Sequence, residues 1–482
     1  MDPVSTVVTS EAALSLTSHP LQRAGARAVA VLAGRTEPAE VTFADLKVVA
    51  ARLVDDIVAA ALASKDAAAY DWWKVLFALY PNSKATHSRR ARDRGILLPD
   101  VAALFAADAP APGLTGRPCT FCGKSASVVW TKVNLPMYDT SKALNTLPPG
   151  VAGWPLCRGC RIAVWALPYG AWVSAGSATV LCCEQSSAEA EFVRRNVLRA
   201  RRVMHLGFDG LGAGARPEVV VLRALRALGP DLPGAATLWS FKNDNQDPWL
   251  RVTRTRRAVP GFLATVDGNV EPRRGWRLLE LALTVRDKIG KPVRSGPAEA
   301  ARLLFEADDG RSRSLLLQIH HLLDDPRMSW DRTNRAALTR LAFIYAEEVL
   351  GMNPDLKPVA TVIADWIEHG SGAPRGRLAE YRNVALSDYK LGALLMQAHF
   401  RLTLDGRAVS AGPDDWRPLI QQRPRAWEQR MLLSVTVLQL LQERGVTVNE
   451  APTDPDDEAR TELLVQQPIL GGEDEDDDLG AA

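Results

Sequence analysis

Two pairs of cysteines constrain this chain more than any other feature of its sequence. Cys119 and Cys122 form one Cys-x-x-Cys motif, and Cys157 and Cys160 form a second one after a gap of 34 residues. Each motif can present two thiolates to one ion, and four thiolates complete the tetrahedral shell of Zn²⁺. Because that shell leaves no position for a reactive water, the sequence predicts a structural zinc site. The alternative is four free thiols.

The segment between the two motifs is rich in proline and glycine and has little hydrophobic periodicity. A loop of this length inside a folded domain needs something to hold it, and a bound metal ion supplies such a cross-link. The sequence therefore predicts a small zinc module that is inserted into a larger body.

Hydrophobic periodicity divides the rest of the chain into a mixed region and a helical region. Thr42 and Asp45 have the spacing of a helix-capping box, and residues 178–183 and 236–242 have the composition of strands. From about residue 300 to 446, apolar residues recur at helical spacing. We expect an α+β fold, in which a mixed N-terminal region with an inserted four-cysteine, zinc-finger-like module precedes a C-terminal helical bundle and a disordered acidic tail.

The expected boundaries divide the 482 residues into five parts. These are a mostly helical part (1–116), the zinc module (117–165), an α+β part that contacts nucleic acid (166–298), the helical bundle (299–450) and the acidic tail (451–482). Within the bundle, the helical stretches are 335–350, 357–369, 377–402 and the segment from Trp427 to Leu441.

The charge of the chain is unevenly distributed. The formal net charge is +2, but the residues from Asp454 onward carry −10, so the preceding part carries +12. A basic body of this size suits a polyanionic partner, although solubility alone is the alternative explanation. The sequence has neither an apolar run that could span a membrane nor a secretory leader, so we expect a cytoplasmic protein without a membrane partner. It also lacks the common catalytic motifs, and we expect no enzymatic activity.

Two stretches combine basic residues with side chains suited to nucleic acid. Arginine binds phosphate through paired hydrogen bonds, and asparagine and glutamine can read base edges. Solvated loops and polar hairpins have the same composition. The candidate residues are Lys84, Arg89, Arg90 and Arg92 in the first stretch, and Lys242, Asn243, Asn245, Gln246, Arg251, Arg254, Arg256 and Arg257 in the second. We expect residues 251–256 to form a strand with one basic face.

Several blocks of the first 260 residues follow one another in an order that is known from one protein family. They are His19-Pro20-Leu21 with Gly25 and residues 38–46, Leu79–Ser83, Cys119–Gly123, Gly150–Pro155 with Leu156–Ala163 and Ala166–Gly170, and Trp239–Asn243 with Gln246. In this order they resemble the large subunit of type I-B CRISPR Cascade complexes, in the group named for its CXXC–CXXC region. The C-terminal helices resemble the family only in being a helical domain. Such subunits end in a helical domain that is similar to the small subunit of the complex.

The resemblance implies a non-catalytic subunit of a guide-RNA surveillance complex. Such a subunit contacts the guide RNA (crRNA) and the backbone and small subunits of Cascade. It recognises a short flanking motif (PAM) in target double-stranded DNA and supports duplex opening and R-loop formation. A helicase-nuclease is then recruited for cleavage. Under this resemblance, Asn243, Asn245 and Gln246 contact the flanking motif, while the arginines of residues 251–257 contact phosphate.

Two rival functions remain open on the sequence. A nuclease or polymerase-like subunit would need a cluster of acidic metal ligands in a folded domain. A zinc-stabilised regulator that binds DNA or RNA on its own would need sequence-specific binding without guide RNA.

Overall fold

The computed structural model describes most of the chain between residues 13 and 470. The described residues are 13–107, 117–126, 128–131, 133–136, 153–211, 216–227, 229, 233–243, 247–289, 292–307, 314–325, 330–370, 372–446, 455–467 and 469–470. They form two compact units. Unit 1 contains the described residues up to Ala224 and those of Ala235–Arg254, and unit 2 contains those of Leu225–Gly234 and from Thr255 onward. The five expected segments are a finer division and stay predictions.

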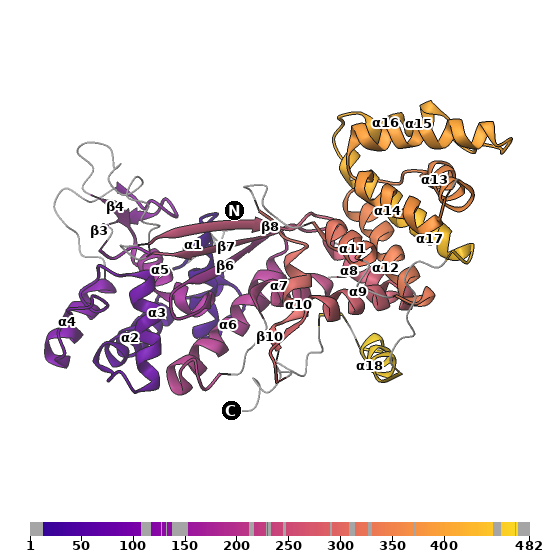
Figure 1. The fold of residues 1–482 in the computed structure, drawn as a ribbon. Helices are drawn as coiled ribbons and strands as arrows, with labels where there is room; N and C mark the ends of the chain where they lie inside the picture. Colours follow the sequence, from indigo (N-terminus) through magenta and orange to yellow (C-terminus); the bar gives the residue numbers. More distant parts are fainter. Residues whose placement is uncertain are drawn as a thin grey trace, which may run out of the picture. The chain divides into compact units, whose positions relative to one another are not determined.

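Unit 1 combines helices with a small antiparallel sheet (Figure 1). Its helices are α1 (Pro20–Leu32), the 3₁₀ helix η1 (Pro38–Glu40), α2 (Phe43–Leu62), α3 (Ala68–Leu79), α4 (Arg94–Leu104), α5 (Arg158–Gly170) and α6 (Ser186–Leu206), and α7 (Pro217–Ala227) runs across the boundary to unit 2. The capping box that begins α2 is confirmed, because Thr42 Oγ1 accepts from the Asp45 N–H at 3.1 Å and the Asp45 carboxylate accepts from the Thr42 N–H at 3.0 Å.

Four strands of unit 1 form an antiparallel sheet in the order β8-β7-β6-β5. They are β5 (Trp172–Val173), β6 (Ala178–Cys183), β7 (Ala236–Lys242) and β8 (Trp249–Arg254). The strands expected at 178–183 and 236–242 are confirmed. Val180 lies opposite Trp239 in the register of this sheet.

Helix α5 lies at the centre of unit 1 and is buried along its whole length after Arg158. It crosses α1 at very short range because both helices carry glycine at the crossing. A Cβ atom on Gly25 would lie 1.8 Å from the Ala163 carbonyl oxygen, and one on Gly170 would lie 2.6 Å from the Ala24 carbonyl oxygen. No side chain fits at either glycine without moving a backbone, so the crossing depends on glycine at both positions.

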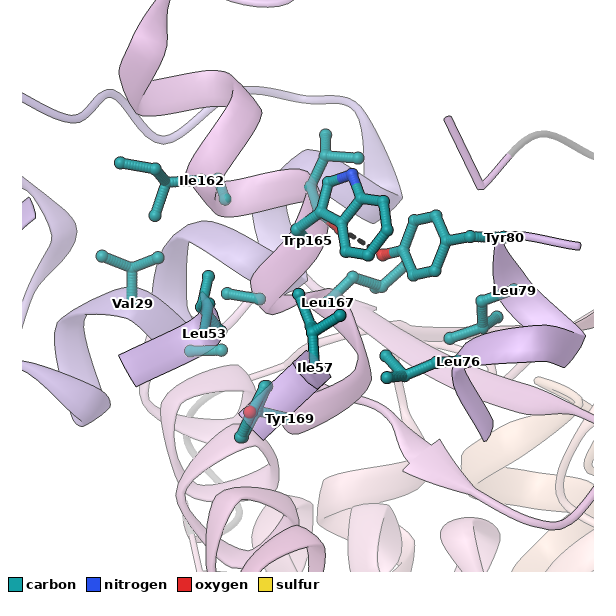
Figure 2. Packing of buried hydrophobic residues seen from close by; sticks show 14 of the residues in the cluster. Val29, Leu53, Ile57, Leu76, Leu79, Tyr80, Ile162, Trp165, Leu167 and Tyr169 are labelled. Carbon is teal, nitrogen blue, oxygen red and sulfur yellow. Dashed lines mark hydrogen bonds between the residues drawn. The ribbon is translucent and has the colours of Figure 1, made fainter. Parts of the chain in front are cut away.

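An aromatic pair attaches the end of α3 to α5. The Tyr80 ring stacks on the Trp165 ring at a centroid distance of 4.1 Å, and the Tyr80 hydroxyl donates to the Val164 carbonyl at 2.6 Å (Figure 2). Complete burial raises the pKa of Tyr80 well above its ordinary value, so the hydroxyl stays protonated and continues to donate. The core of unit 1 thus assembles around α5, directly behind the second cysteine pair.

Unit 2 is mainly helical, as expected for the C-terminal region. Its helices are α8 (Val259–Gly268), α9 (Val270–Leu283), α10 (Gly296–Arg302), α11 (Leu315–Asp324), α12 (Arg332–Ile344) with the π-helical turn Tyr345–Val349, α13 (Lys357–His369), α14 (Pro374–Val384), α15 (Asp388–Leu404), α16 (Pro413–Ile420), α17 (Ala426–Glu443) and α18 (Pro455–Val465). Short strands also occur at β9 (Val285–Arg286), β10 (Pro292–Arg294) and β11 (Glu306–Ala307). The single helix expected at 377–402 is wrong, because the chain turns between α14 and α15.

The expectation of a disordered tail from residue 451 is wrong for the part that the structure describes. Residues of α18 and the segment after it pack on α9. The Arg274 guanidinium pairs with Glu462, and Arg273 donates to the Val465 carbonyl at 3.2 Å. Ile469 and Leu470 are fully buried. Two apolar side chains and a set of arginine contacts therefore anchor this segment in unit 2.

Candidate metal centre and candidate nucleic-acid interface

The first cysteine pair sits on a tight hairpin between β1 (Arg117–Pro118) and β2 (Ser125–Ala126). The Cys119 N–H donates to the Lys124 carbonyl at 2.6 Å, and the Gly123 N–H donates to the Cys119 carbonyl at 2.9 Å. Gly123 has a φ of 77°, a conformation that glycine adopts without strain. This turn places the Cys119 and Cys122 side chains on the same side of the hairpin end, as a metal-binding knuckle requires.

The second pair sits where a strand turns into α5. Strand β4 (Trp154–Leu156) pairs with β3 (Val128–Trp130) and leads directly into Cys157, which is the N-cap residue of α5. Cys160 lies in the first turn of that helix. The N-terminus of a helix carries partial positive charge and favours thiolates nearby, so this position suits two negatively charged sulfur ligands.

The two pairs meet and form one four-cysteine cluster. The four Sγ atoms lie within 4.8 Å of one another, and the Sγ atoms of Cys122 and Cys157 are 3.5 Å apart. A tetrahedral zinc site with Zn–S bonds of about 2.3 Å has S···S edges of about 3.8 Å, which matches this spacing. The donor set is four sulfurs, three of them from buried residues. The residues therefore fit a closed structural zinc site.

The protonation of the four thiols is strongly coupled. Hydrogen bonds from Cys122, Cys157 and Cys160 hold the pKa of Cys119 far below its ordinary value. The hydrogen bond with Cys119 opposes ionisation of Cys122, but those with Cys157 and Cys160 lower its pKa to about 7. The pKa values of Cys157 and Cys160 rise, chiefly because both donate to the Cys119 sulfur. Because zinc binds cysteine as thiolate, a metal ion bound here would displace the protons that the cluster still holds.

The N-terminal segment and an aromatic group surround the cysteine cluster. Phe121 lies between His19 and Trp154, at ring-centroid distances of 4.8 and 5.9 Å. Gln22 places its amide nitrogen 3.8 Å from the Cys160 sulfur. Burial lowers the pKa of His19, which keeps its imidazole neutral. These neighbours were not predicted from the sequence, because neither a lone glutamine nor a lone histidine signals a contact with residues more than 100 positions away.

A second group of potential ligands lies in unit 2. One ligand atom from each of Asp365, Glu368 and His369 lies within 4.8 Å of the others. Arg444 already occupies the position of a cation there, since its guanidinium is 2.6 Å from Asp365 and 3.1 Å from Glu368. This group is an arginine-centred ion cluster rather than a metal site.

The first basic stretch follows α3 and combines exposed cations with buried residues. Lys84, Arg89 and Arg92 are exposed, and Lys84 pairs with Asp100 at 2.9 Å. Arg90 is different, because it is buried. Its Nε donates to the Ala61 carbonyl at 2.7 Å, and its guanidinium lies 3.9 Å from the Trp73 ring centroid.

Burial lowers the pKa of Arg90 to about 10, so the side chain keeps its charge at neutral pH. Its contacts with Ala61 and Trp73 give Arg90 a structural role, and we no longer place it in the nucleic-acid interface.

Asn243, the residue directly after β7, is fixed to the end of α3. This side chain is buried and donates to the Leu79 carbonyl at 2.9 Å, while its N–H donates to the Ala78 carbonyl at 3.2 Å. Asn243 therefore ties the end of β7 to α3 and is buried rather than exposed to a ligand, contrary to the sequence interpretation. Lys242 is half-buried and lies 3.8 Å from Asp247. Asn245 and Gln246 lie outside the described residues.

The arginines of the second stretch are divided between the two units. Arg251 and Arg254 are exposed on β8, opposite Ser240 and Thr237. Because their separation is odd, their side chains point to opposite faces of the sheet. Arg256 lies beyond the strand and pairs with Glu306 at 2.6 Å, and Arg257 is exposed. The expected strand is confirmed as far as Arg254, but its continuation to residue 256 with one basic face is wrong.

Comparison with known proteins gives no match. Neither the protein-family models, nor the curated proteins, nor the solved structures give a match to this chain. Among the described helices, none combines the length and the apolar character that crossing a membrane requires.

Proposed function

We propose that the chain is the non-catalytic large subunit of a type I CRISPR guide-RNA surveillance complex. In this role it recognises the flanking motif in duplex DNA, supports duplex opening and R-loop formation, and takes part in recruiting the helicase-nuclease. Sequence is then read mainly by pairing with the guide, while the protein reads only a short flank.

The observation that carries the proposal is the mutual packing of the motifs behind the resemblance. The first block contacts the first cysteine motif through His19 and Phe121, whose ring centroids are 4.8 Å apart. The first block also contacts the extension of the second motif, where Gly25 meets Ala163.

The remaining blocks join the same core. Tyr80 of the second block donates to Val164, next to the second cysteine motif, at 2.6 Å. Asn243 of the last block donates to the Leu79 carbonyl of the second block at 2.9 Å. Blocks that lie far apart in the sequence thus pack in one contiguous core, as the parts of a single subunit body would.

Within this proposal the exposed cations contact phosphate and the buried polar residues hold them in position. The phosphate-binding residues are Lys84, Arg89 and Arg92 on one loop, and Arg251, Arg254 and Arg257 near β8. Arg90 and Asn243 stabilise the two loops from within. Asn245 and Gln246 are the proposed contacts to the flanking motif, and the zinc ion of the cysteine cluster is structural.

The test is co-expression of the chain with its genomic neighbours, followed by affinity purification and sequencing of the bound RNA. We expect short RNAs of uniform repeat-plus-spacer type together with stoichiometric backbone subunits. A chain that purifies alone and free of nucleic acid would contradict the proposal and favour the stand-alone zinc-stabilised binder.

The phosphate contacts have a separate test with a matched control. The double variant Arg89→Glu/Arg92→Glu should weaken binding of the purified complex to duplex DNA and reduce the slope of log affinity against log salt by about 1 per lost contact. Arg375→Glu, at an exposed position of α14, should leave the slope unchanged. If the wild-type complex and both variants have equal slopes, Arg89 and Arg92 do not contact DNA phosphates.

A further inference from the structure

A short hairpin of unit 2 carries apolar side chains that face solvent. Strand β9 pairs with β10 in a two-stranded sheet of its own. The exposed fractions are 46% for Val285, 85% for Ile289 and 71% for Val293. A two-stranded hairpin is marginally stable in water unless it packs an apolar face against other structure. Because these side chains bury little surface within the chain, the stability of the fold does not explain why they are aliphatic, and an interaction with a partner does.

The base of this hairpin is held firmly by two helices. Thr284 alone connects α9 to β9, and Ser295 alone connects β10 to α10 (Figure 1). Thr284 Oγ1 donates to the Glu280 carbonyl at 2.8 Å, and Ser295 Oγ accepts from the Ala298 N–H at 3.5 Å. Gly296 lies directly on α9, because a Cβ atom on it would be 1.8 Å from the Glu280 carbonyl oxygen. The packing of α9 against α10 therefore fixes where the exposed residues of the hairpin stand.

Cations lie on both faces of the hairpin. In the antiparallel register, Arg294 lies opposite Val285, and Arg286 lies opposite Pro292. Residues that lie directly opposite each other share a face, while consecutive residues of a strand point to opposite faces. Arg286 and Arg294 are therefore on different faces.

The turn adds a third cation beside the most exposed apolar residue. Lys288 is exposed and directly precedes Ile289. Asp287 accepts from the Ile289 N–H at 3.0 Å, so its carboxylate shapes the turn. In the sequence, residues 285–294 contain four basic residues and one acidic residue, so their formal net charge is +3. An apolar surface that is surrounded by positive charge is complementary to a partner that combines flat apolar groups with phosphates.

We propose that this hairpin inserts its apolar residues between the base pairs of duplex DNA where the two strands begin to separate. The inference rests on the proposed function, in which the chain supports duplex opening. Aliphatic side chains that enter the base stack unstack neighbouring pairs and kink the duplex. With the hairpin in this position each face meets one of the separating strands, so Arg286 contacts the phosphates of one strand and Arg294 those of the other.

An anionic membrane surface fits the hairpin less well. Every exposed apolar residue of the hairpin has a cation as its neighbour in the chain. These pairs are Val285 and Arg286, Ile289 and Lys288, and Val293 and Arg294. Insertion into hydrocarbon would draw the charges into a medium that does not solvate them. Between base pairs, the same cations stay in water beside the phosphates.

The first test measures duplex opening by the purified guide-RNA complex. The probe is a guide-matched duplex that the wild-type complex selects from a pool with randomised flanks, and it carries 2-aminopurine at the first target position beside the flank. Ile289→Ser/Val293→Ser should slow the rise in fluorescence at least about 10-fold, because the stacked pairs then open without an inserted side chain. Leu404→Ser, which removes a side chain of similar exposure (83%) from α15, should leave the opening rate unchanged.

A pre-opened duplex separates this role from ordinary binding. When the pairs beside the flank are mismatched, the hairpin variant should bind as tightly as the wild-type complex. Equal opening rates of variant and wild type on paired DNA would overturn the inference, and so would an equal loss of affinity for both DNAs. Failure of the proposed function has a different signature, since the wild-type chain would then purify without guide RNA.

The second test needs no guide RNA and therefore decides the inference in that case as well. The full chain is titrated with forked duplex DNA at several salt concentrations. Arg286→Glu/Arg294→Glu should reduce the slope of log affinity against log salt by about 2, one for each lost phosphate contact, while Arg375→Glu on α14 should not. An unchanged slope would overturn the inference. Co-sedimentation with phosphatidylserine vesicles that is lost in Ile289→Ser/Val293→Ser would also overturn it, because the hairpin would then be a membrane contact.

Discussion

The two groups of clustered ligand atoms differ in how their charge is balanced. The cysteine cluster of unit 1 and the Asp365–Glu368–His369 cluster of unit 2 both bring their ligand atoms within 4.8 Å of one another. In unit 2, Arg444 supplies the cation directly. In unit 1, the arginines on either side of Cys160, Arg158 and Arg161, donate to the carbonyls of Phe105 and Leu104. Closely spaced ligand atoms are therefore not enough to identify a metal site. What distinguishes the two clusters is whether a side chain of the protein already supplies the positive charge that balances the ligands.

The largest expected effect is loss of the metal ligand in unit 1. Cys160→Ser should abolish the single equivalent of zinc that elemental analysis should find in the wild-type chain. It should also lower the free energy of unfolding of unit 1 by at least about 3 kcal/mol, because the binding free energy of a structural zinc contributes directly to folding. Cys182→Ser, outside the cluster, should keep its zinc. If the wild-type chain stays folded and takes up no zinc, the cysteine cluster is not a structural metal site.

The second-largest expected effect is the pH dependence of zinc binding by the cysteine cluster. The pKa values of Cys157 and Cys160 are raised in the metal-free cluster, so zinc has to displace protons from them. The apparent zinc affinity should therefore rise with pH, by about 10-fold per pH unit for each proton that zinc displaces. Chelator competition at fixed pH values measures this change. A pH-independent affinity would show that the thiols are not the ligands.

The smallest effect is expected at the arginine-centred cluster. Arg444→Met should lower the free energy of unfolding by about 1 kcal/mol, as for partly exposed ion pairs, and denaturant unfolding can measure it. Arg417→Met, which removes an exposed pair with Asp414, should change stability less. Titration of the wild-type chain should saturate at one zinc equivalent. A second equivalent that disappears in Asp365→Asn would make the unit 2 cluster a metal site after all.

The features that could be predicted from the sequence are those fixed by near neighbours in the chain. The capping box of Thr42 and Asp45 involves residues three positions apart, and each cysteine knuckle is a turn of four residues. The strands at 178–183 and 236–242 likewise follow from their own composition.

The features that could not be predicted depend on distant partners. Arg90 and Arg89 are adjacent and chemically identical, yet Arg90 is buried because Trp73 and the Ala61 carbonyl receive its guanidinium. Asn243 is withdrawn from solvent by a carbonyl of Leu79. A similar reason explains α18, whose acidic composition suggested disorder but which packs on the arginines of α9. In each case the deciding atom lies far away in the sequence.

The close contact between α1 and α5 has a consequence for the order of events during protein synthesis. Gln22 and Cys160, which this contact brings together, are 138 residues apart. A ribosome that adds about 5–20 residues per second needs on the order of 10 s to deliver α5 after α1. Throughout that time the apolar side chains of α1 lack α5, on which they pack in the folded unit. The first cysteine pair is made during this interval, and it then waits for 34 more residues before the second pair follows. The nascent chain therefore buries the inner face of α1 and completes its four-cysteine cluster only after α5 has been made.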